Sequence, residues 1–480
     1  MSENASQKSH RSKTSPFSTI QLFFNQLLNK FINRKWKSHL YAILPHPTEA
    51  KVLMLWNKSG CSLPHICVND DLECDDIPII NKELEQKLGI SVNILYCTKN
   101  YYDKSKHEIH SVYVLEQNDS ITKLKEGSWI DLETLRKLSV KLPEYKLVIE
   151  EYLTEIESGD IPEVRSPWAK VGWFDSANQW INEQLQELNY QQLSPVECIK
   201  NWAISCVLRV ATNRGNLYLK EASTLPLFCN EPVVTTELSK LFPEHIPTVL
   251  SIDSQRHWML LADFGEPIGR SSSVKVKKDV YLLLAQIQIK SVEHIDRLLN
   301  VGCLDRRLEK LATQIDALFN DKNALSQLKQ AEINQLQTLA PYLKNLCSQL
   351  ADYKIPQTLV HGDLHLGNVA LYNDNYLLFD WTDSCIAHPF FDMFQFYFSR
   401  NNIPFLSSVK VVKNEYLNQW TIYESKSRVL EAWKLAKPLC ALHHAVTYQY
   451  ISNCLEPREK HLFSNALSDF LREILKCKIE

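Results

Sequence analysis

The stretch that decides the fold reads Leu359-Val360-His361-Gly362-Asp363-Leu364-His365-Leu366-Gly367-Asn368. A second apolar run, Tyr376-Leu377-Leu378-Phe379, follows it and leads into Asp380. An apolar run, a polar loop, a turn and another apolar run predict a strand, a loop and a hairpin. Asp363 can accept a hydroxyl proton, and Asn368 and Asp380 can hold Mg²⁺ on nucleotide phosphates. The stretch therefore carries the residue types that phosphoryl transfer needs.

The composition limits the classes of protein that the chain can represent. Its 480 residues allow two or three domains, and its net charge of -3 argues against a nucleic-acid partner. The 13 cysteines are scattered, without a C-x-x-C pair or Cys/His metal spacing. We therefore expect reduced packing thiols and a cytoplasmic location. No apolar run approaches the ~20 residues of a membrane span. Composition does not predict the oligomeric state.

The N-terminal residues divide into a tail and a helix. Residues 1–14 are polar without periodicity and predict a disordered tail. Residues 15–37 carry apolar side chains at helical spacing and end in basic residues, which predicts an amphipathic basic helix. Such a helix can lie on a membrane surface, through residues 17–37, or pack on the next domain. We favour packing.

Residues 38–156 show a mixed α/β pattern. Strands are expected at 40–44, 51–56, 91–97 and 110–115, with a helix over Asn81–Gly89. This order, with Leu63-Pro64 and Trp129-Ile130-Asp131, resembles a Nudix domain. That family binds Mg²⁺ through paired Glu on this helix, where this chain has Gln86 and Lys87. Lys87 would repel a cation, so we expect a degenerate Nudix-like domain without hydrolase activity.

A β-rich segment follows a predicted linker at 157–170 and spans residues 171–265. Strands at 205–210 and 216–220 are joined by a tight turn, with Lys220 at the end of the second. Asn230 could cap the next helix and place Glu231 to pair with Lys220, with Glu237 as the alternative. Such a lysine can reach the α- and β-phosphates of a nucleotide, although a solvated lysine is the commoner reading.

Two further strands, at 247–252 and 258–262, end in Asp263-Phe264-Gly265. This triplet looks like the metal-binding triplet of protein kinases. We reject that role because it precedes the catalytic stretch. We expect the run to cross between two lobes on the adenine side. Residues 266–480 then carry apolar residues at helical spacing, which predicts a helical lobe around the site.

The catalytic stretch gives the more specific resemblance. The run 361–368, Asp380-Trp381 a hairpin later, and His388-Pro389-Phe390-Phe391-Asp392 together resemble the aminoglycoside phosphotransferase family. That family has a protein-kinase-like fold and includes other small-molecule kinases. The similarity covers roughly residues 165–480. It implies an α+β, two-lobed kinase-like fold, with a small β-rich N-lobe and a large helical C-lobe, after the Nudix-like α/β domain.

The resemblance also implies roles for individual residues. Asp363 would be the catalytic base or would orient the acceptor hydroxyl, and His361 would position the loop backbone. Asn368 and Asp380 would bind Mg²⁺, and Lys220 would hold the α/β-phosphates with Glu231 behind it. Two further acidic residues remain: Asp392 would anchor the structure, and Asp383 would touch substrate or cap a helix.

The leading hypothesis is a Mg²⁺-dependent phosphotransferase that moves the γ-phosphate of ATP or GTP to a hydroxyl of a small molecule. The alternative is a pseudokinase or nucleotide-binding module whose Nudix-like domain binds a partner or ligand. Phosphorylation of protein-bound groups is not excluded. Aminoglycosides are polycations and would need an acidic cleft, which the sequence does not reveal. The identity of the acceptor is therefore open.

Overall fold

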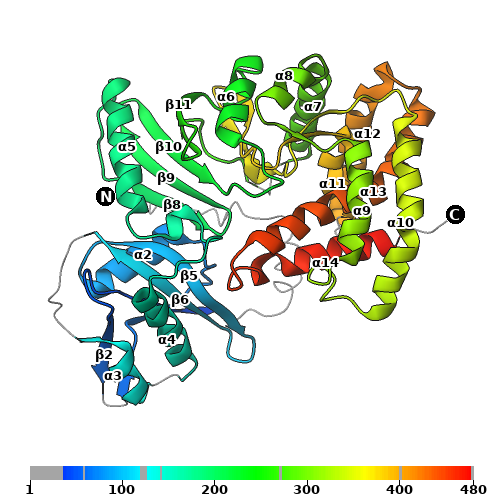
Figure 1. The fold of residues 1–480 in the computed structure, drawn as a ribbon. Coiled ribbons are helices and arrows are strands. Elements are labelled where there is room, and N and C mark those ends of the chain that lie inside the picture. Colours follow the sequence, from blue (N-terminus) through cyan, green and yellow to red (C-terminus); the bar gives the residue numbers. More distant parts are fainter. Residues whose placement is uncertain are drawn as a thin grey trace, which may run out of the picture.

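The computed structural model describes residues 36–57, 60–118, 127–140, 143–269, 273–398 and 403–476 (Figure 1). The predicted tail at 1–14 and the amphipathic helix at 15–37, except for its last two residues, lie outside these ranges. The predicted end of that helix is wrong, because Lys37 is the first residue of strand β1 (Lys37–Ile43) and pairs with Glu108. No helix among the described residues is long and apolar enough to cross a membrane.

The N-terminal part is built on two sheets. A four-stranded sheet has the order β4-β1-β6-β5, in which β1 and β6 are parallel and the other pairs are antiparallel. A three-stranded sheet has the order β3-β2-β7. Their bounds, with those of three helices, are β2 (Val52–Asn57), β3 (Gly60–Ser62), β4 (His65–Val68), β5 (Val92–Asp103), β6 (Glu108–Gln117), β7 (Ser128–Ile130), α2 (Ile77–Leu88), α3 (Leu132–Lys137) and α4 (Pro143–Ser158).

Strand alternation divides the core of this part in two. Leu40 and Ala42 of β1 pack in a cluster with residues of α2, whereas Tyr41 and Ile43 pack in a cluster with residues of α4. The predicted helix over Asn81–Gly89 starts earlier, at Ile77, and ends as expected where Gly89 takes a φ of 72°. Gln86 and Lys87 are exposed on α2. The Nudix-like assignment of residues 38–156 stays a prediction.

The second part is an antiparallel five-stranded sheet of order β11-β12-β10-β9-β8. Its elements are α5 (Trp173–Glu187), β8 (Glu197–Trp202), β9 (Ser205–Thr212), β10 (Gly215–Ala222), α6 (Glu231–Leu241), β11 (Val249–Asp253) and β12 (Trp258–Leu261). The predicted hairpin at 205–220 is present, and Gly215 at its turn has a φ of 105°. One hydrophobic cluster contains side chains from β1, α4, α5 and β10.

The predicted linker at 157–170 is closely tied to its neighbours. Trp168 is buried and donates to the carbonyl oxygen of Trp202 at 2.9 Å. Arg165 is buried and pairs with Glu155 of α4 and with Glu456 beyond α13, at 2.5 and 2.7 Å. The domain boundaries stay predictions, but the segment between α4 and α5 joins the N-terminal part to the far end of the chain.

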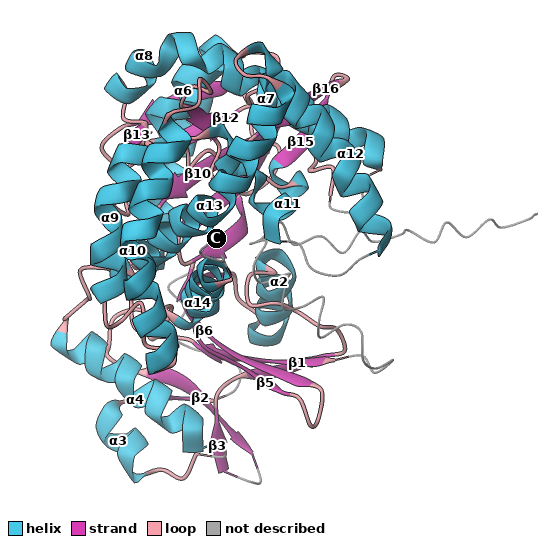
Figure 2. Ribbon diagram, turned by 90° about the vertical axis from the view of Figure 1, so that its right-hand side faces the viewer, coloured by secondary structure: helices cyan, strands magenta, loops and turns pink. Residues whose placement is uncertain are grey.

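The third part is a helical lobe (Figures 1 and 2). Its helices are α7 (Val274–Ser291), α8 (Ile295–Asn300), α9 (Leu308–Asn320), α10 (Gln330–Ala351), α11 (Phe394–Phe398), α12 (Ile403–Gln419), α13 (Lys426–Cys454) and α14 (His461–Leu475). Its short strands are β13 (Leu304–Asp305), β14 (Thr358–Val360), β15 (Val369–Tyr372), β16 (Asn375–Leu378) and β17 (Cys385–Ala387). A sheet lobe followed by a helical lobe confirms the predicted α+β class and the order of the two lobes.

Candidate active site

The catalytic stretch lies between the two lobes, as a loop between β14 and the hairpin β15–β16. Gly362 has a φ of 87°, and a Cβ there would lie 2.4 Å from the backbone oxygen of Asp383. Only glycine fits this position without strain. Asp392 accepts from the backbone N–H groups of His361 and Gly362 at 2.9 and 2.8 Å. A buried carboxylate therefore holds the start of the loop in place.

Burial sets the charge states around this loop. It raises the pKa of Asp392 to about 7 against the opposing hydrogen bonds from the backbone of residues 361–362 and from Gln288. It lowers the pKa of His361 to about 4, so that the imidazole is neutral at pH 7. The His361 ring contacts the backbone oxygen of Phe379 through Nε2 at 3.0 Å. His361 thus ties the catalytic loop to the residue before Asp380.

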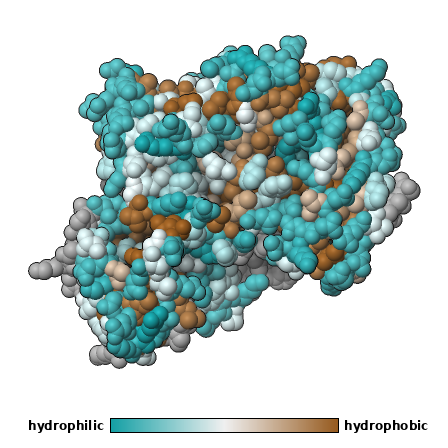
Figure 3. All heavy atoms as spheres, viewed as in Figure 1, coloured by the Kyte–Doolittle hydropathy of each residue, from teal (hydrophilic) through white to brown (hydrophobic). Residues whose placement is uncertain are grey.

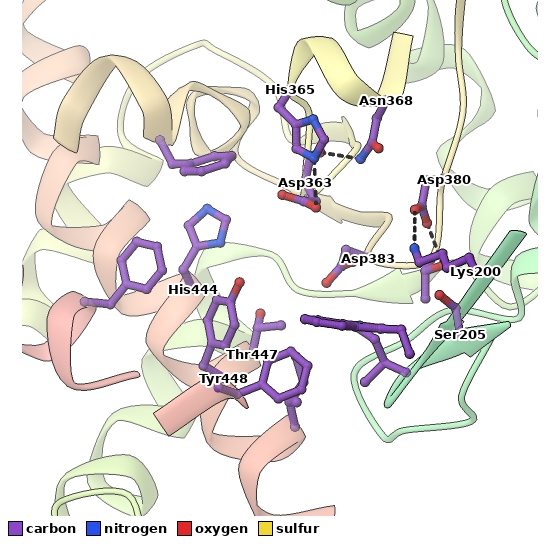
Figure 4. Close-up of a pocket in the computed structure, with 18 residues that line it drawn as sticks. Lys200, Ser205, Asp363, His365, Asn368, Asp380, Asp383, His444, Thr447 and Tyr448 are labelled. Carbon is purple, nitrogen blue, oxygen red and sulfur yellow. Dashed lines mark hydrogen bonds and ion pairs between the residues drawn. The ribbon is translucent and has the colours of Figure 1, made fainter. Parts of the chain in front are cut away.

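Asp363 and Asn368 lie at the two ends of this loop. The Asn368 side chain donates to the backbone oxygen of Asp363 at 3.0 Å. The Asp363 side chain is 37% exposed, and its Oδ2 lies 3.7 Å from Nε2 of His365. The loop therefore presents a carboxylate and an amide together at the edge of the space between the lobes (Figure 4).

Lys220 connects the sheet lobe to the helical lobe. Its Nζ donates to Oε1 of Glu231 and to Oδ1 of Asp380, both at 2.6 Å. It also donates at 3.0 Å to the hydroxyl of Thr382, which in turn donates to Oε2 of Glu231 at 2.8 Å. Glu231, at the start of α6, is thus the partner of Lys220. The alternative partner, Glu237, instead pairs with Arg297.

The proposed cap at the start of α6 was wrong in its chemistry. Asn230 occupies the N-cap position, but its side chain makes no cap hydrogen bond, and its Oδ1 is buried without a hydrogen-bond partner. Glu231 is instead held by its ion pair with Lys220.

The opposite charges in this cluster keep Lys220 and Asp380 ionised. Burial opposes the ammonium of Lys220, but Asp380 and Glu231 outweigh it and raise its pKa above the usual range. Burial also opposes the carboxylate of Asp380, but Lys220 and then Lys200 outweigh it and hold its pKa well below the usual range. Asp380 is therefore ionised at neutral pH.

Lys200 is a site residue that was missed from the sequence. It lies on β8, lines the cavity, and its Nζ is 3.8 Å from Oδ2 of Asp380. Burial lowers its pKa to about 8, against the opposing effect of Asp380. Residues 197–202 were not predicted as a strand, so nothing in the sequence pointed Lys200 at the site. The register of β8 against β9 brings it there.

The triplet Asp263-Phe264-Gly265 does not reach this cluster. Asp263 accepts from the backbone N–H groups of Asn216 and Gly265 at 3.1 and 3.0 Å. Phe264 packs against Tyr218 and Phe379. The triplet thus closes the end of the β9–β10 hairpin, which agrees with rejecting a metal-binding role.

A pocket open to solvent adjoins Asp363. On one side it is polar, and on the other α13, α14 and the β8–β9 turn supply apolar side chains (Figure 4). The apolar and aromatic lining residues are Trp202, Ile204, Phe394, Tyr448, Ile451, Phe463 and Phe470. Apolar side chains also gather on the surface between the sheet lobe and the helical lobe (Figure 3). Burial gives His444, at the same wall, a pKa of about 3, so its ring is neutral.

Asp383 also lines this cavity. The suggestion that it caps a helix is wrong, because strand β17 follows it. Burial, and then the charge of Asp380, raises the pKa of Asp383 to about 7. Asp383 can therefore carry a proton near neutral pH while it faces the space above Asp363.

Residues 291–421 match the model of the phosphotransferase enzyme family. This match confirms the resemblance that the catalytic stretch predicted, over the segment that contains Asp363, Asn368 and Asp380. A search of curated proteins found no match.

The solved structures that match parts of this chain include a macrolide phosphotransferase and a choline kinase. The macrolide 2'-phosphotransferase from Brachybacterium faecium has 12% identity over 61% of this chain and 98% of that chain, with a TM-score of 0.41. The choline kinase from Streptococcus pneumoniae has 13% identity over 63% and 100%, also with a TM-score of 0.41. A Sinorhizobium meliloti protein described only provisionally as an oxidoreductase has 20% identity over 30% of this chain, with a TM-score of 0.23. This chain spans 46% of its length.

Proposed function

We propose that this protein is a kinase that moves the γ-phosphate of ATP or GTP to a hydroxyl group of a small molecule. The observation that carries the proposal is the convergence of Asp363, Asn368 and Asp380 at one cavity edge, where Asp380 pairs with Lys220 at 2.6 Å. Lys220 comes from the sheet lobe and the other three from the helical lobe. The family match over residues 291–421 supports the same chemistry.

Each residue has a role that its surroundings permit. Asp363, partly exposed at the cavity, accepts or orients the proton of the acceptor hydroxyl. Lys220 neutralises charge on the α- and β-phosphates, and Glu231 keeps it oriented. His361 and Asp392 position the loop and do not contact the reacting atoms. Phosphoryl transfer asks mainly for such positioning and charge neutralisation.

The oxygen ligands fit Mg²⁺. Asn368 supplies an amide oxygen, and Asp380 supplies a carboxylate that Lys220 keeps ionised. Hard cations such as Mg²⁺ prefer these oxygen donors and bind together with substrate phosphates. When bound, Mg²⁺ would supply neutralisation of the phosphate charge. Asp380 would then exchange its contact with Lys220, at least in part, for the metal.

The cavity favours an acceptor with an apolar body. Its carboxylates are Asp363, Asp380 and Asp383. Of these, Asp380 already pairs with lysine, and Asp383 titrates at about 7. A polycation would need a more acidic cleft. The aromatic wall suits a ring system or a hydrophobic chain that carries its hydroxyl toward Asp363.

The test is nucleotide turnover with and without a library of hydroxyl compounds, with Mg²⁺. We expect a subset of amphiphilic alcohols to stimulate release of nucleoside diphosphate and to become phosphorylated. Asp363→Asn should abolish this stimulation. Asp374→Asn, in the turn between β15 and β16 and away from the cavity, is the matched control. Turnover by Asp363→Asn at the wild-type rate would overturn the assignment.

One region of the structure favours the alternative, a pseudokinase or nucleotide-binding module. The turn between β8 and β9 contains no glycine, and Trp202 packs edge-to-face on Phe463 with ring centroids 5.3 Å apart. This ring contact packs strand β8 of the sheet lobe directly against α14, beside the pocket where an acceptor would bind. Nucleotide binding with Mg²⁺ but no product with any acceptor would support the alternative. No nucleotide binding at all would contradict the kinase and favour a pseudokinase.

A further inference from the structure

A row of metal-ligating side chains crosses the N-terminal sheet, far in sequence from the kinase-like site. His39 on β1 pairs in register with Cys67 on β4 and with His110 on β6. Side chains at paired positions of neighbouring strands point to the same face. Glu108 lies two residues before His110 on β6 and therefore shares this face. The sheet thus brings a thiol, two imidazoles and a carboxylate together.

The distances between these groups are close to those around a bound metal ion. His39 Nε2 lies 3.7 Å from Oε1 of Glu108 and 4.0 Å from Sγ of Cys67, and His110 Nε2 lies 3.4 Å from Oε2 of Glu108. Ligand atoms of His39, Glu108 and His110 all lie within 4.8 Å of one another. Zinc binds these ligands at ~2.0–2.3 Å, which places neighbouring ligands of a tetrahedron roughly 3.3–3.7 Å apart.

The surroundings present the required nitrogen atoms. Nδ1 of His39 lies 3.0 Å from Nε2 of His65, a partner that can fix its tautomer and leave Nε2 for a metal. Nδ1 of His110 lies 3.3 Å from the hydroxyl of Tyr145 on α4. Nε2 of His110 is buried and makes no hydrogen bond, although Oε2 of Glu108 lies 3.4 Å from it, and a buried nitrogen without a hydrogen bond is costly. A ligand at Nε2 would remove this cost.

We infer that Cys67, His39, Glu108 and His110 form a binding site for a transition metal ion such as Zn²⁺. Nitrogen and sulfur donors select Zn²⁺ over Mg²⁺ or Ca²⁺, which prefer oxygen. On binding, the Cys67 thiol gives its proton to solvent and the imidazoles bind as neutral rings. Cys67 is exposed, so the site can be loaded from solvent. The ion would join three adjacent strands of this sheet.

The test uses the full-length protein without a polyhistidine tag, stripped with chelator and titrated with Co²⁺ and then Zn²⁺ in the absence of nucleotide. We expect one equivalent of Co²⁺ with the intense visible bands of tetrahedral coordination and a thiolate charge-transfer band. Zn²⁺ should displace it and raise the unfolding temperature. Weak octahedral bands, or no saturable binding, would overturn the proposal.

Variants separate this site from the kinase-like site. His39→Ala and His110→Ala should each weaken metal binding at least about tenfold. Cys67→Ser should remove the thiolate band, and its persistence would overturn the four-ligand site. His294→Ala, in the helical lobe, and Asp380→Asn should keep the full equivalent. Equal affinity in His39→Ala and the wild type would also refute the site, whatever the outcome of the turnover assay.

Discussion

Lys220 and Asp380 form an ion pair at 2.6 Å although 160 residues separate them in the chain. Lys220 belongs to the sheet lobe and Asp380 to the loop after the hairpin of the helical lobe. The pair therefore fixes the two lobes around the space where a nucleotide would bind. Glu231 and Thr382 complete the group, so that no charge in it lacks a partner.

Replacing Lys220 with Met should damage both stability and function. It would leave Glu231, which is 2% exposed, as a buried carboxylate without its cation. Breaking a buried pair in this way costs about 3–5 kcal/mol. We expect denaturant unfolding to show this loss, and the double variant Lys220→Met/Glu231→Gln to recover part of it. Both variants should bind nucleotide more weakly than the wild type. Equal losses in the single and double variants would show that the pair does not set the stability.

Asp363→Asn should affect catalysis without affecting the fold. Asp363 is partly exposed, and asparagine has nearly the same shape as aspartate, so stability should change little. Loss of a general base costs about 10²–10⁴-fold in rate. We expect kcat to fall by this factor while nucleotide affinity, measured by calorimetry, stays the same. A large loss of nucleotide affinity would instead place Asp363 among the groups that bind nucleotide.

Lys200 should give nucleotide binding a pH dependence. Its pKa is lowered to about 8, so the side chain is cationic below this pH and neutral above it. If the ammonium contacts phosphate, affinity for nucleotide should weaken as the pH rises through about 8. Lys200→Arg should remove this dependence, because a guanidinium stays charged. The measurement is the dissociation constant between pH 6.5 and 9.5. The same slope in both proteins would show that Lys200 is not the titrating group.

The lowered pKa of Lys200 also makes a separate prediction for stability. Between about pH 8 and the unfolded pKa near 10.4, the unfolded chain holds a proton that the folded chain has released. The free energy of unfolding should therefore rise with pH through this window, apart from other groups. In Lys200→Met this rise should be smaller. An identical pH dependence in the variant would mean that Lys200 titrates normally in the folded protein.

Within the segment between α4 and α5, we expect replacement of Arg165 to lower the stability of the protein. Glu155 and Glu456 hold its guanidinium, and together they raise its pKa despite the opposing effect of burial. Arg165→Met would remove the cation that Glu155 and Glu456 share, but Arg458 still pairs with Glu456, so the cost should lie below the ~3–5 kcal/mol of a fully broken buried pair. Arg209→Met, which breaks a half-exposed pair with Glu197, should cost no more than about 1 kcal/mol. Similar losses in the two variants would contradict a structural role for Arg165.

Local sequence was enough to predict the catalytic loop. Gly362, Asp363 and Asn368 lie within one short segment, so their spacing records the loop geometry directly. The Lys220–Glu231 pair could also be predicted, because a strand and the helix after it have few ways to pack. The end of the helix at Gly89 followed from glycine's tolerance of positive φ.

Contacts between distant segments could not be predicted in this way. Lys200 reaches Asp380 only because β8 lies at the edge of the five-stranded sheet and the sheet lobe closes on the helical lobe. Spacing in the sequence likewise gave no sign of the row from Cys67 through His39 to His110. Three strands with a parallel and an antiparallel pairing create it.

The loop and the hairpin on which the proposed chemistry depends were predictable, because their residues lie close together in the sequence. The surroundings of that loop required the folded chain: the partners of Lys220 and Asp380, the aromatic wall of the pocket, and the cluster on the N-terminal sheet. The physical reason is that ion pairs and cavities form between elements whose distance along the chain carries no information about their distance in space.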